Sequence, residues 1–199
     1  MPLSPPVARS PQHTRAITLN GYLRTDGLYD IEAELTDTKS FSFPSAFRGQ
    51  VAAGDKIHAM ALRVTVTPSL DIVACEAAMD AHPYETCHLA APNFARLAGL
   101  RIGPGFLKSV QERVGGSAGC THLRELLAQL ATTAIQTVYA SEVKRDADAK
   151  NQPLPPGDGF DAAISDRFGG ANGAVNSCMA YADTGPVVRH RWPDRYRGP

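Results

Sequence analysis

"GLYDIEAELTD", residues 27–37, alternates apolar and polar side chains over most of its length. Its apolar side chains share one phase, and the acidic side chains of Asp30, Glu32 and Glu34 occupy the other. This period of two is typical of a strand with one buried and one hydrated face, as antiparallel sheets provide. The preceding residues 15–24 predict a partner strand, and Asp26-Gly27 between them is a strong hairpin-turn signal.

A second hairpin is predicted over residues 56–66 and 70–80, with its turn at Pro68-Ser69. After residue 90 the apolar period changes from two to about 3.6 residues, which indicates helices. The helices are expected at residues 92–100, 104–114 and, most clearly, 121–140, where leucines form one apolar stripe. Strands followed by helices predict an α+β fold, in which helices cover one face of an antiparallel sheet.

The expected organisation is one domain with short extensions. It comprises a proline-rich lead (1–14), a single α+β domain (15–193) and a basic tail (194–199). Within the domain we expect strands over 15–80, helices over 92–145 and an irregular extension over 146–193, because glycine and proline interrupt that last part. Residues 175–192 are expected to form one more hairpin or to wrap around the domain.

The composition excludes several classes of protein. Twenty basic residues balance twenty acidic ones, which argues against a nucleic-acid binder. The amino terminus has no apolar stretch of signal-peptide length, and no run approaches the roughly 18 apolar residues of a membrane span. We therefore expect a cytoplasmic protein, in which the four cysteines are buried side chains, metal ligands or nucleophiles instead of disulfides.

Some charged side chains fall where the pattern expects apolar ones. His58 is in phase with Met60 and Leu62, on the predicted buried face, either as a hydrogen-bonded core residue or as a ligand or base. Glu76 is in phase with apolar neighbours and is interpreted as a cross-strand partner of Arg63, its predicted diagonal neighbour. The acids of residues 30–34 are most simply the hydrated face of a strand, although paired carboxylates also suit acid–base chemistry.

"GGSAGCTHLREL", residues 115–126, sets glycines, a cysteine and a histidine at the start of the clearest helix. Thr121 is the expected N-cap. A thiol at such a position has a lowered pKa, which suits a nucleophile as well as a metal ligand. Cys120 and His122 are therefore either metal ligands or a thiolate with its base, with Glu125 one turn further along. A buried thiol beside a capped helix is the structural alternative.

A metal site needs more ligands than this pair. Cys87 and Cys178 would complete a Cys3His set with Cys120 and His122, a combination common for zinc. His82, His88 and His58 are alternative ligands. The paired C-x-x-C hooks of typical zinc sites are absent from the sequence. A set of three protein ligands would leave a catalytic position open, whereas all four would make a closed structural site.

Several ordered blocks, among them "HTRAITLNGYLR", "CEAAMDAHPYETC" and "VNSCMAYADTGPVVRHRWP", resemble a bacterial family catalogued as a domain of unknown function, number 2889. The resemblance extends from about His13 to about Pro193 and implies a single domain that includes the C-terminal segment. It implies no activity. Where the family pattern leads us to expect a histidine after the last cysteine, this chain has Met179.

Two functions compete. The first is an enzyme on a small organic substrate, such as an aromatic or carbonyl-containing acid, and zinc would make it a hydrolase or lyase of small-molecule catabolism. Its catalytic residues would be His122, Cys120, His58 and Glu125, and its substrate-binding residues Arg15, Arg24 and His13. The second is a non-catalytic binding or accessory subunit that docks on a larger enzyme. A homo-oligomer is compatible with either.

Overall fold

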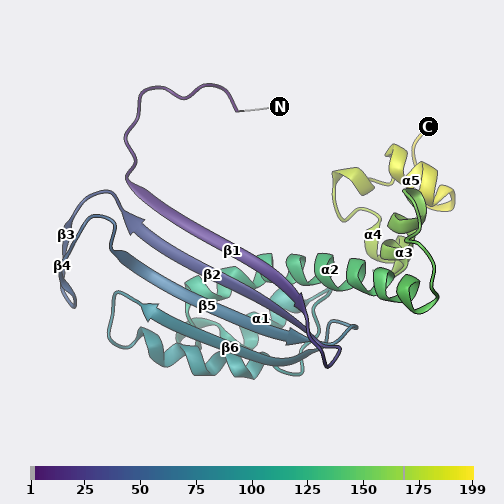
Figure 1. Ribbon diagram of the computed structural model, residues 1–199. Helices are drawn as coiled ribbons and strands as arrows, with labels where there is room; N and C mark the ends of the chain where they lie inside the picture. The colour runs from purple at the N-terminus through teal and green to yellow at the C-terminus, as the bar shows by residue number, and fades with distance from the viewer. Residues whose placement is uncertain (1–2, 168) are drawn as a thin grey trace. The chain divides into compact units, whose positions relative to one another are not determined.

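A computed structural model describes residues 3–167 and 169–199, and the chain gathers into two units, residues 1–135 and 136–199. The first unit holds a four-stranded sheet and the helices that cover it. The predicted α+β class is confirmed, with N-terminal strands followed by C-terminal helices (Figure 1). The boundary between the units falls inside the longest helix, and the domain limits at residues 15 and 193 remain predictions.

The sheet is antiparallel throughout and consists of the two predicted hairpins, joined side by side. Its strands, in spatial order, are β1 (His13–Leu23), β2 (Tyr29–Lys39), β5 (Lys56–Val66) and β6 (Ile72–Ala81). Between β2 and β5, where we expected only a loop, β3 (Phe43–Ser45) and β4 (Gly49–Val51) form a small separate ribbon. Gly27, with φ of 84°, makes the left-handed turn between β1 and β2.

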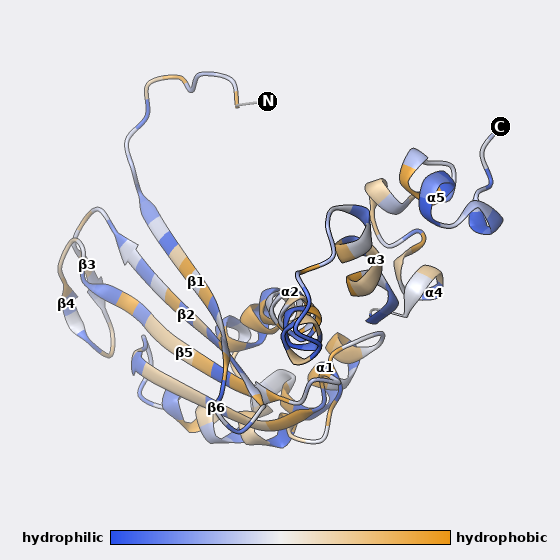
Figure 2. Ribbon diagram, turned by 45° about the vertical axis from the view of Figure 1, so that its right-hand side comes forward, coloured by the Kyte–Doolittle hydropathy of each residue, from blue (hydrophilic) through white to orange (hydrophobic). Residues whose placement is uncertain are grey.

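One face of the sheet is the core and the other is hydrated. On β2 the apolar residues Tyr29, Ile31 and Ala33 are fully buried, whereas Glu34 is exposed. On β5 Leu62 and Val64 lie on the same buried face. Figure 2 shows hydrophobic and hydrophilic residues interspersed along the strands of this sheet. The period-two pattern therefore gave the correct buried face for the central strands.

The β5–β6 hairpin differs from the prediction in register. Glu76 lies directly opposite Arg63, not diagonal to it, and the two side chains form an ion pair of 3.2 Å. The connection uses residues 67–71 with Leu70 at φ 65°, and the pairing shifts between Thr65 and Val66. This bulge reverses the phase of β6, so that Glu76 takes the exposed face and Cys75 the buried one.

The helices of the first unit lie on one side of the sheet (Figure 1). They are a 3-10 helix η1 (Cys87–Leu97), α1 (Phe106–Val114), a short 3-10 turn η2 (Gly116–Ala118) and the start of α2 (Thr121–Ala149). The helix predicted from residue 92 therefore starts earlier and is 3-10, and α2 continues nine residues beyond its predicted end at Ala140. Its predicted apolar stripe is buried, including Leu123, Leu126 and Leu130.

The second unit is helical where we expected irregular structure. After α2 it contains α3 (Asp158–Arg167), α4 (Gly170–Ala174), η3 (Met179–Tyr181), α5 (Pro186–Arg191) and η4 (Pro193–Arg195). Glycine or proline lies at the start of several of these short helices. In α5, for example, Gly185 is the N-cap and Pro186 is the first helical residue, a position where proline is compatible with a helix. The hairpin considered for residues 175–192 is replaced by η3 and α5.

Across the two described stretches of chain, no helix is both long enough and apolar enough to span a bilayer.

We expect Leu126→Ala to lower the free energy of unfolding by about 2–5 kcal/mol, because it leaves a cavity between α2 and the sheet. Leu126 is fully buried, whereas Gln129 on the same helix is exposed and provides the control substitution Gln129→Ala. Urea unfolding of both variants checks this. Equal losses in the two variants would contradict the assignment of the buried face.

Candidate functional site

Asp37 is a buried carboxylate in the sheet. It continues the phase of Tyr29, Ile31, Ala33 and Leu35 on β2 and is 1% exposed. Its two oxygens accept four hydrogen bonds, from His13 Nε2 (3.0 Å), Arg15 Nε (2.9 Å) and Nη2 (2.8 Å), and His58 Nδ1 (2.8 Å). Four bonds match the acceptor capacity of a carboxylate, so that the buried charge is fully solvated by the protein.

The sheet register places these partners. Arg15 on β1 and His58 on β5 lie directly opposite Asp37, one on each side, and His13 lies one pleat away on β1. Residues directly opposite in antiparallel strands have neighbouring side chains on the same face. Three adjacent strands thus contribute one residue or more to a single cluster.

The cluster keeps Asp37 ionised. Burial alone would raise the pKa of its carboxyl group. The hydrogen bonds from Arg15 and His58, and the positive charge of Arg15, outweigh burial and hold the pKa of Asp37 well below its usual value of 3.8. The pKa of Arg15 is raised in turn, chiefly by its hydrogen bond to Asp37.

His58 is oriented by this carboxylate. Its side chain is 12% exposed, and its Nδ1 is engaged by Asp37. The pKa of His58 is lowered from 6.5, first by burial and then by the neighbouring His122, and these effects exceed the opposing influence of Asp37. A neutral imidazole that donates from Nδ1 has an unprotonated Nε2, which can accept a proton or bind a metal.

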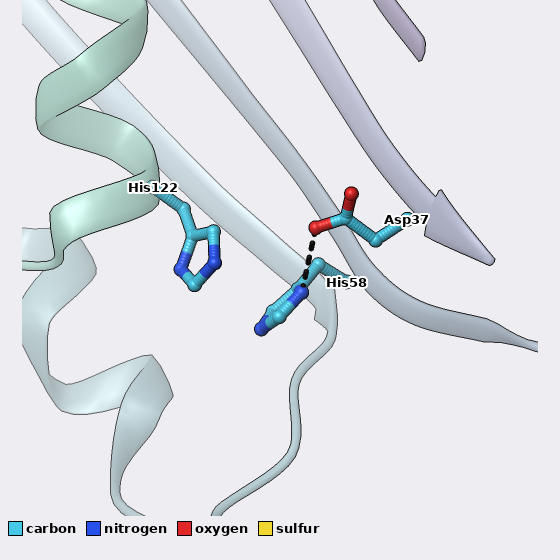
Figure 3. Close-up of side chains that lie close together, drawn as sticks. All are labelled: Asp37, His58 and His122. Atoms are coloured by element: carbon cyan, nitrogen blue, oxygen red, sulfur yellow. Dashed lines mark hydrogen bonds and ion pairs between the residues drawn. The ribbon is translucent and has the colours of Figure 1, made fainter. Parts of the chain in front are cut away.

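His122 approaches His58 from the other layer of the fold. It lies in the first turn of α2, and the two rings are 3.9 Å apart between centroids with 34° between their planes. Figure 3 shows the two imidazoles side by side, with Asp37 on the sheet beyond His58. One ligand atom from each of Asp37, His58 and His122 lies within 4.8 Å of the others, a separation at which one metal ion can be held.

The turn before α2 places Cys120 beside this group. The carbonyl oxygen of Cys120 accepts a hydrogen bond from the backbone N–H of Arg124 at 2.9 Å. The N-cap is therefore Cys120, and the prediction of Thr121 as N-cap was wrong. Its sulfur lies 3.9 Å from His122 Nδ1. A Cβ atom at Gly119 would stand 1.9 Å from the carbonyl oxygen of Val114. Close packing of the α1–α2 turn therefore explains this glycine without any ligand.

A cavity of about 610 Å³ adjoins the cluster. Its wall includes both imidazoles, the thiols of Cys87 and Cys120, and the side chain of Asn93. This volume suits a small organic molecule. Polar groups that converge on one side of a concave surface are typical of a binding or active site.

A second hollow, of about 740 Å³, lies over β5, β6 and η1 and is larger but chemically less suited. Its carboxylates belong to the hydrated face of the sheet, and Arg63 pairs with both Glu32 and Glu76. Burial raises the pKa of the Cys75 thiol in its wall to about 12, which makes that thiol unreactive. The acids of residues 30–34 are thus accounted for as a solvated face.

Most of the residues selected from the sequence gather around Asp37. His13 and Arg15 bind it directly, and Glu125 pairs with Arg15 at 3.1 Å, across 110 residues of sequence. Arg15 is occupied by these two carboxylates, which makes it a positioning group and not a free anchor for a substrate carboxylate. Arg24 lies elsewhere, paired with Asp26 and Asp30 at the opposite end of the β1–β2 hairpin.

The predicted Cys3His set is only partly brought together. Cys87, Cys120 and His122 line one cavity, whereas Cys178 is exposed in the second unit. No cysteine belongs to the close ligand group found among the described residues, which His58 joins instead.

Asp37 was missed, although the signal was available. It is the fifth member of the apolar phase of β2, and an acid in a buried phase requires partners. Once the β1–β2 hairpin is aligned, Arg15 stands opposite it.

Comparison with known proteins adds a family and no activity. The family model described as a protein of unknown function (DUF2889) matches residues 13–136, more than half of the chain. The match begins at His13, as expected, but ends at Gln136 instead of near Pro193, close to the limit of the first unit. No curated protein and no solved structure matches the chain.

Asp37→Asn should lower the free energy of unfolding by about 3 kcal/mol, the cost of leaving one member of a buried ion pair without its partner. The neutral amide of asparagine cannot replace the negative charge of the Asp37 carboxylate, to which both Arg15 and His58 are bonded. Glu34→Gln, on the exposed face of the same strand, is the matched control and should change stability little. Urea unfolding at pH 7 measures the free energy of unfolding of each variant. An Asp37→Asn variant as stable as the wild type would show that the cluster does not support the fold.

Lowering the pH from 7 to 5 should destabilise the protein through His58. Because its pKa is below 6.5 in the folded state, the unfolded chain binds protons more readily there, and stability is lost as the pH falls below 6.5. His58→Gln keeps a donor for Asp37 and removes the titration, so that its melting temperature should depend less on pH over this interval. An identical pH dependence in the two proteins would contradict the lowered pKa.

Proposed function

The chain belongs to this DUF2889 family, whose description assigns no activity, and we propose from the site that it is a metal-assisted enzyme acting on a small organic molecule. In this proposal His58 and His122 bind a divalent ion, most simply zinc, at the wall of the 610 Å³ cavity. The observation that carries the proposal is the hydrogen bond from His58 Nδ1 to a buried, ionised Asp37, with His122 within reach.

The Asp37–His58 pair has the form of a metal-ligand support. Metal-binding histidines commonly donate their second ring N–H to a carboxylate, which fixes the tautomer and the ring orientation. All four bonding directions of Asp37 are used by His13, Arg15 and His58, so its part is to orient His58 and not to bind the ion itself. His58 Nε2 then carries the electron pair that binds the metal.

The site has room for a third protein ligand and for a substrate. Catalytic zinc sites use three protein ligands and leave the fourth position to water or substrate. Cys120, whose sulfur lies 3.9 Å from His122 Nδ1 but outside the close group of Asp37, His58 and His122, is our choice for the third ligand, and its side chain would turn toward the ion on binding. This retains Cys120 and His122 from the predicted set and replaces Cys87 and Cys178 by His58.

A zinc ion in this position would lower the pKa of bound water to about 7 and polarise a substrate carbonyl. We therefore propose a hydrolase or lyase reaction on a carbonyl-containing or aromatic acid. The support by Arg15 and Glu125 links the sheet to α2 and keeps the two histidines at a fixed separation. The four free cysteines fit the cytoplasmic location that we propose.

Tag-free protein purified without chelators should contain about one zinc ion per chain, since three protein ligands bind zinc tightly. His58→Ala and His122→Ala should lose the ion. His190→Ala, which alters an exposed histidine of the second unit, should keep it. Elemental analysis by mass spectrometry measures all four proteins, and a wild type without metal would refute the metal-assisted function.

Turnover is tested separately with 4-nitrophenyl acetate, a simple carbonyl ester whose size is modest beside a cavity of about 610 Å³. Metal-loaded protein should hydrolyse it, a chelator should abolish the reaction, and added zinc should restore it. Metal binding without any turnover would favour the accessory-subunit hypothesis, in which the site is structural.

A further inference from the structure

We propose that two copies of this chain pair through β1 to form one continuous antiparallel sheet. β1 lies at the edge of the four-stranded sheet, with β2 as its only neighbour among the described strands. Nine of its eleven residues are exposed. An edge of this length presents a row of unpaired backbone N–H and C=O groups to another strand. The proposal does not depend on the metal site.

The edge lacks most of the features that prevent pairing, and its one inward-pointing charge, Arg15, is neutralised within the subunit by Asp37. Edge strands are commonly protected by proline, lysine or a β-bulge. β1 has the sequence HTRAITLNGYL, with no proline and no lysine, and its register with β2 is uninterrupted from His13 to Leu23. Its two half-buried residues, Ile17 and Leu19, are apolar and lie on the same face as the core.

The strand is self-complementary in one register. If Thr18 faces Thr18 of the partner subunit across a two-fold axis, all eleven residues of β1 are paired. Ile17 then lies opposite Leu19 of the partner subunit, and the symmetry repeats this contact. Since opposite residues share a face, four apolar side chains meet at the centre of the joint sheet.

The same register extends the wall around Asp37. Arg15 would face Gly21 of the partner subunit, which leaves space for the guanidinium group. His13 would face Leu23 of the partner subunit. These two Asp37 partners are now 34% and 42% exposed, and the added strand would shield them from water.

The oligomeric state of the full chain tests the proposal first. Light scattering after size exclusion, over a range of protein concentrations, should give the mass of two chains. Ile17→Glu should give the mass of one chain with its circular dichroism unchanged, whereas Ala16→Glu, on the other face of β1, should remain a dimer. A wild type that is monomeric at every concentration would overturn the proposal, even if another protein binds the edge.

Cysteine trapping tests the register. Opposite residues in an antiparallel pair are about 4.5–5.5 Å apart between Cα atoms, within disulfide range. In a Cys178→Ala background, which removes the exposed thiol, Thr18→Cys should form a cross-linked dimer on oxidation. Asn20→Cys, two residues along the same face, should not. Equal cross-linking of the two variants, or of neither, would overturn this register.

Discussion

The buried charge of Asp37 is the interaction on which the rest of the site depends. A carboxylate at 1% exposure is tolerated only with partners, and here the partners come from both neighbouring strands. The hydrogen bond with His58 fixes the orientation of that imidazole. The hydrogen bonds with Arg15 hold its guanidinium group where it also pairs with Glu125 of α2. One charge thus determines how the sheet presents its chemistry and how the first turn of α2 is attached to it.

The remaining architecture follows from a sheet with a single apolar face. The alternation on β2 and β5 needs a helical cover, and the leucine stripe of α2 supplies it. The helix that completes the core also brings Cys120 and His122 to the sheet. The glycines before it, of which Gly119 packs against Val114, allow the close turn from α1 that sets its starting point.

Sequence patterns predicted the strands and the main helix because both depend on local periodicity. They predicted the limits of β5 at Lys56 and Val66 without error, and placed the N-cap of α2 one residue late, at Thr121 instead of Cys120. They failed where one residue changes the register, as at the bulge beside Thr65 that moves Glu76 to the exposed face. They also failed in the second unit, where short helices among glycines and prolines have no long period to detect.

The site illustrates the same limit. His58, Cys120 and His122 were chosen as unusual residue types in their positions, and the structure places them around one cavity. Asp37 was overlooked because it stands at the end of the apolar phase of β2, beyond the acids of residues 30–34 that mark the hydrated face. The assignment of Arg15 to a substrate treated it as an isolated cation, whereas strand pairing provides it with an internal partner.

The separation of Arg15 and Glu125 along the sequence has a consequence for how the protein is made. These residues are 110 positions apart, and the cluster needs β1, β2, β5 and the first turn of α2 together. During synthesis the hairpins can form as they emerge from the ribosome and supply all the hydrogen-bond partners of Asp37, but Arg15 lacks Glu125 and the cluster lacks its helical cover until α2 arrives. Non-local contacts of this kind close late. The nascent chain therefore exposes an incompletely covered sheet until the first turns of α2 have emerged.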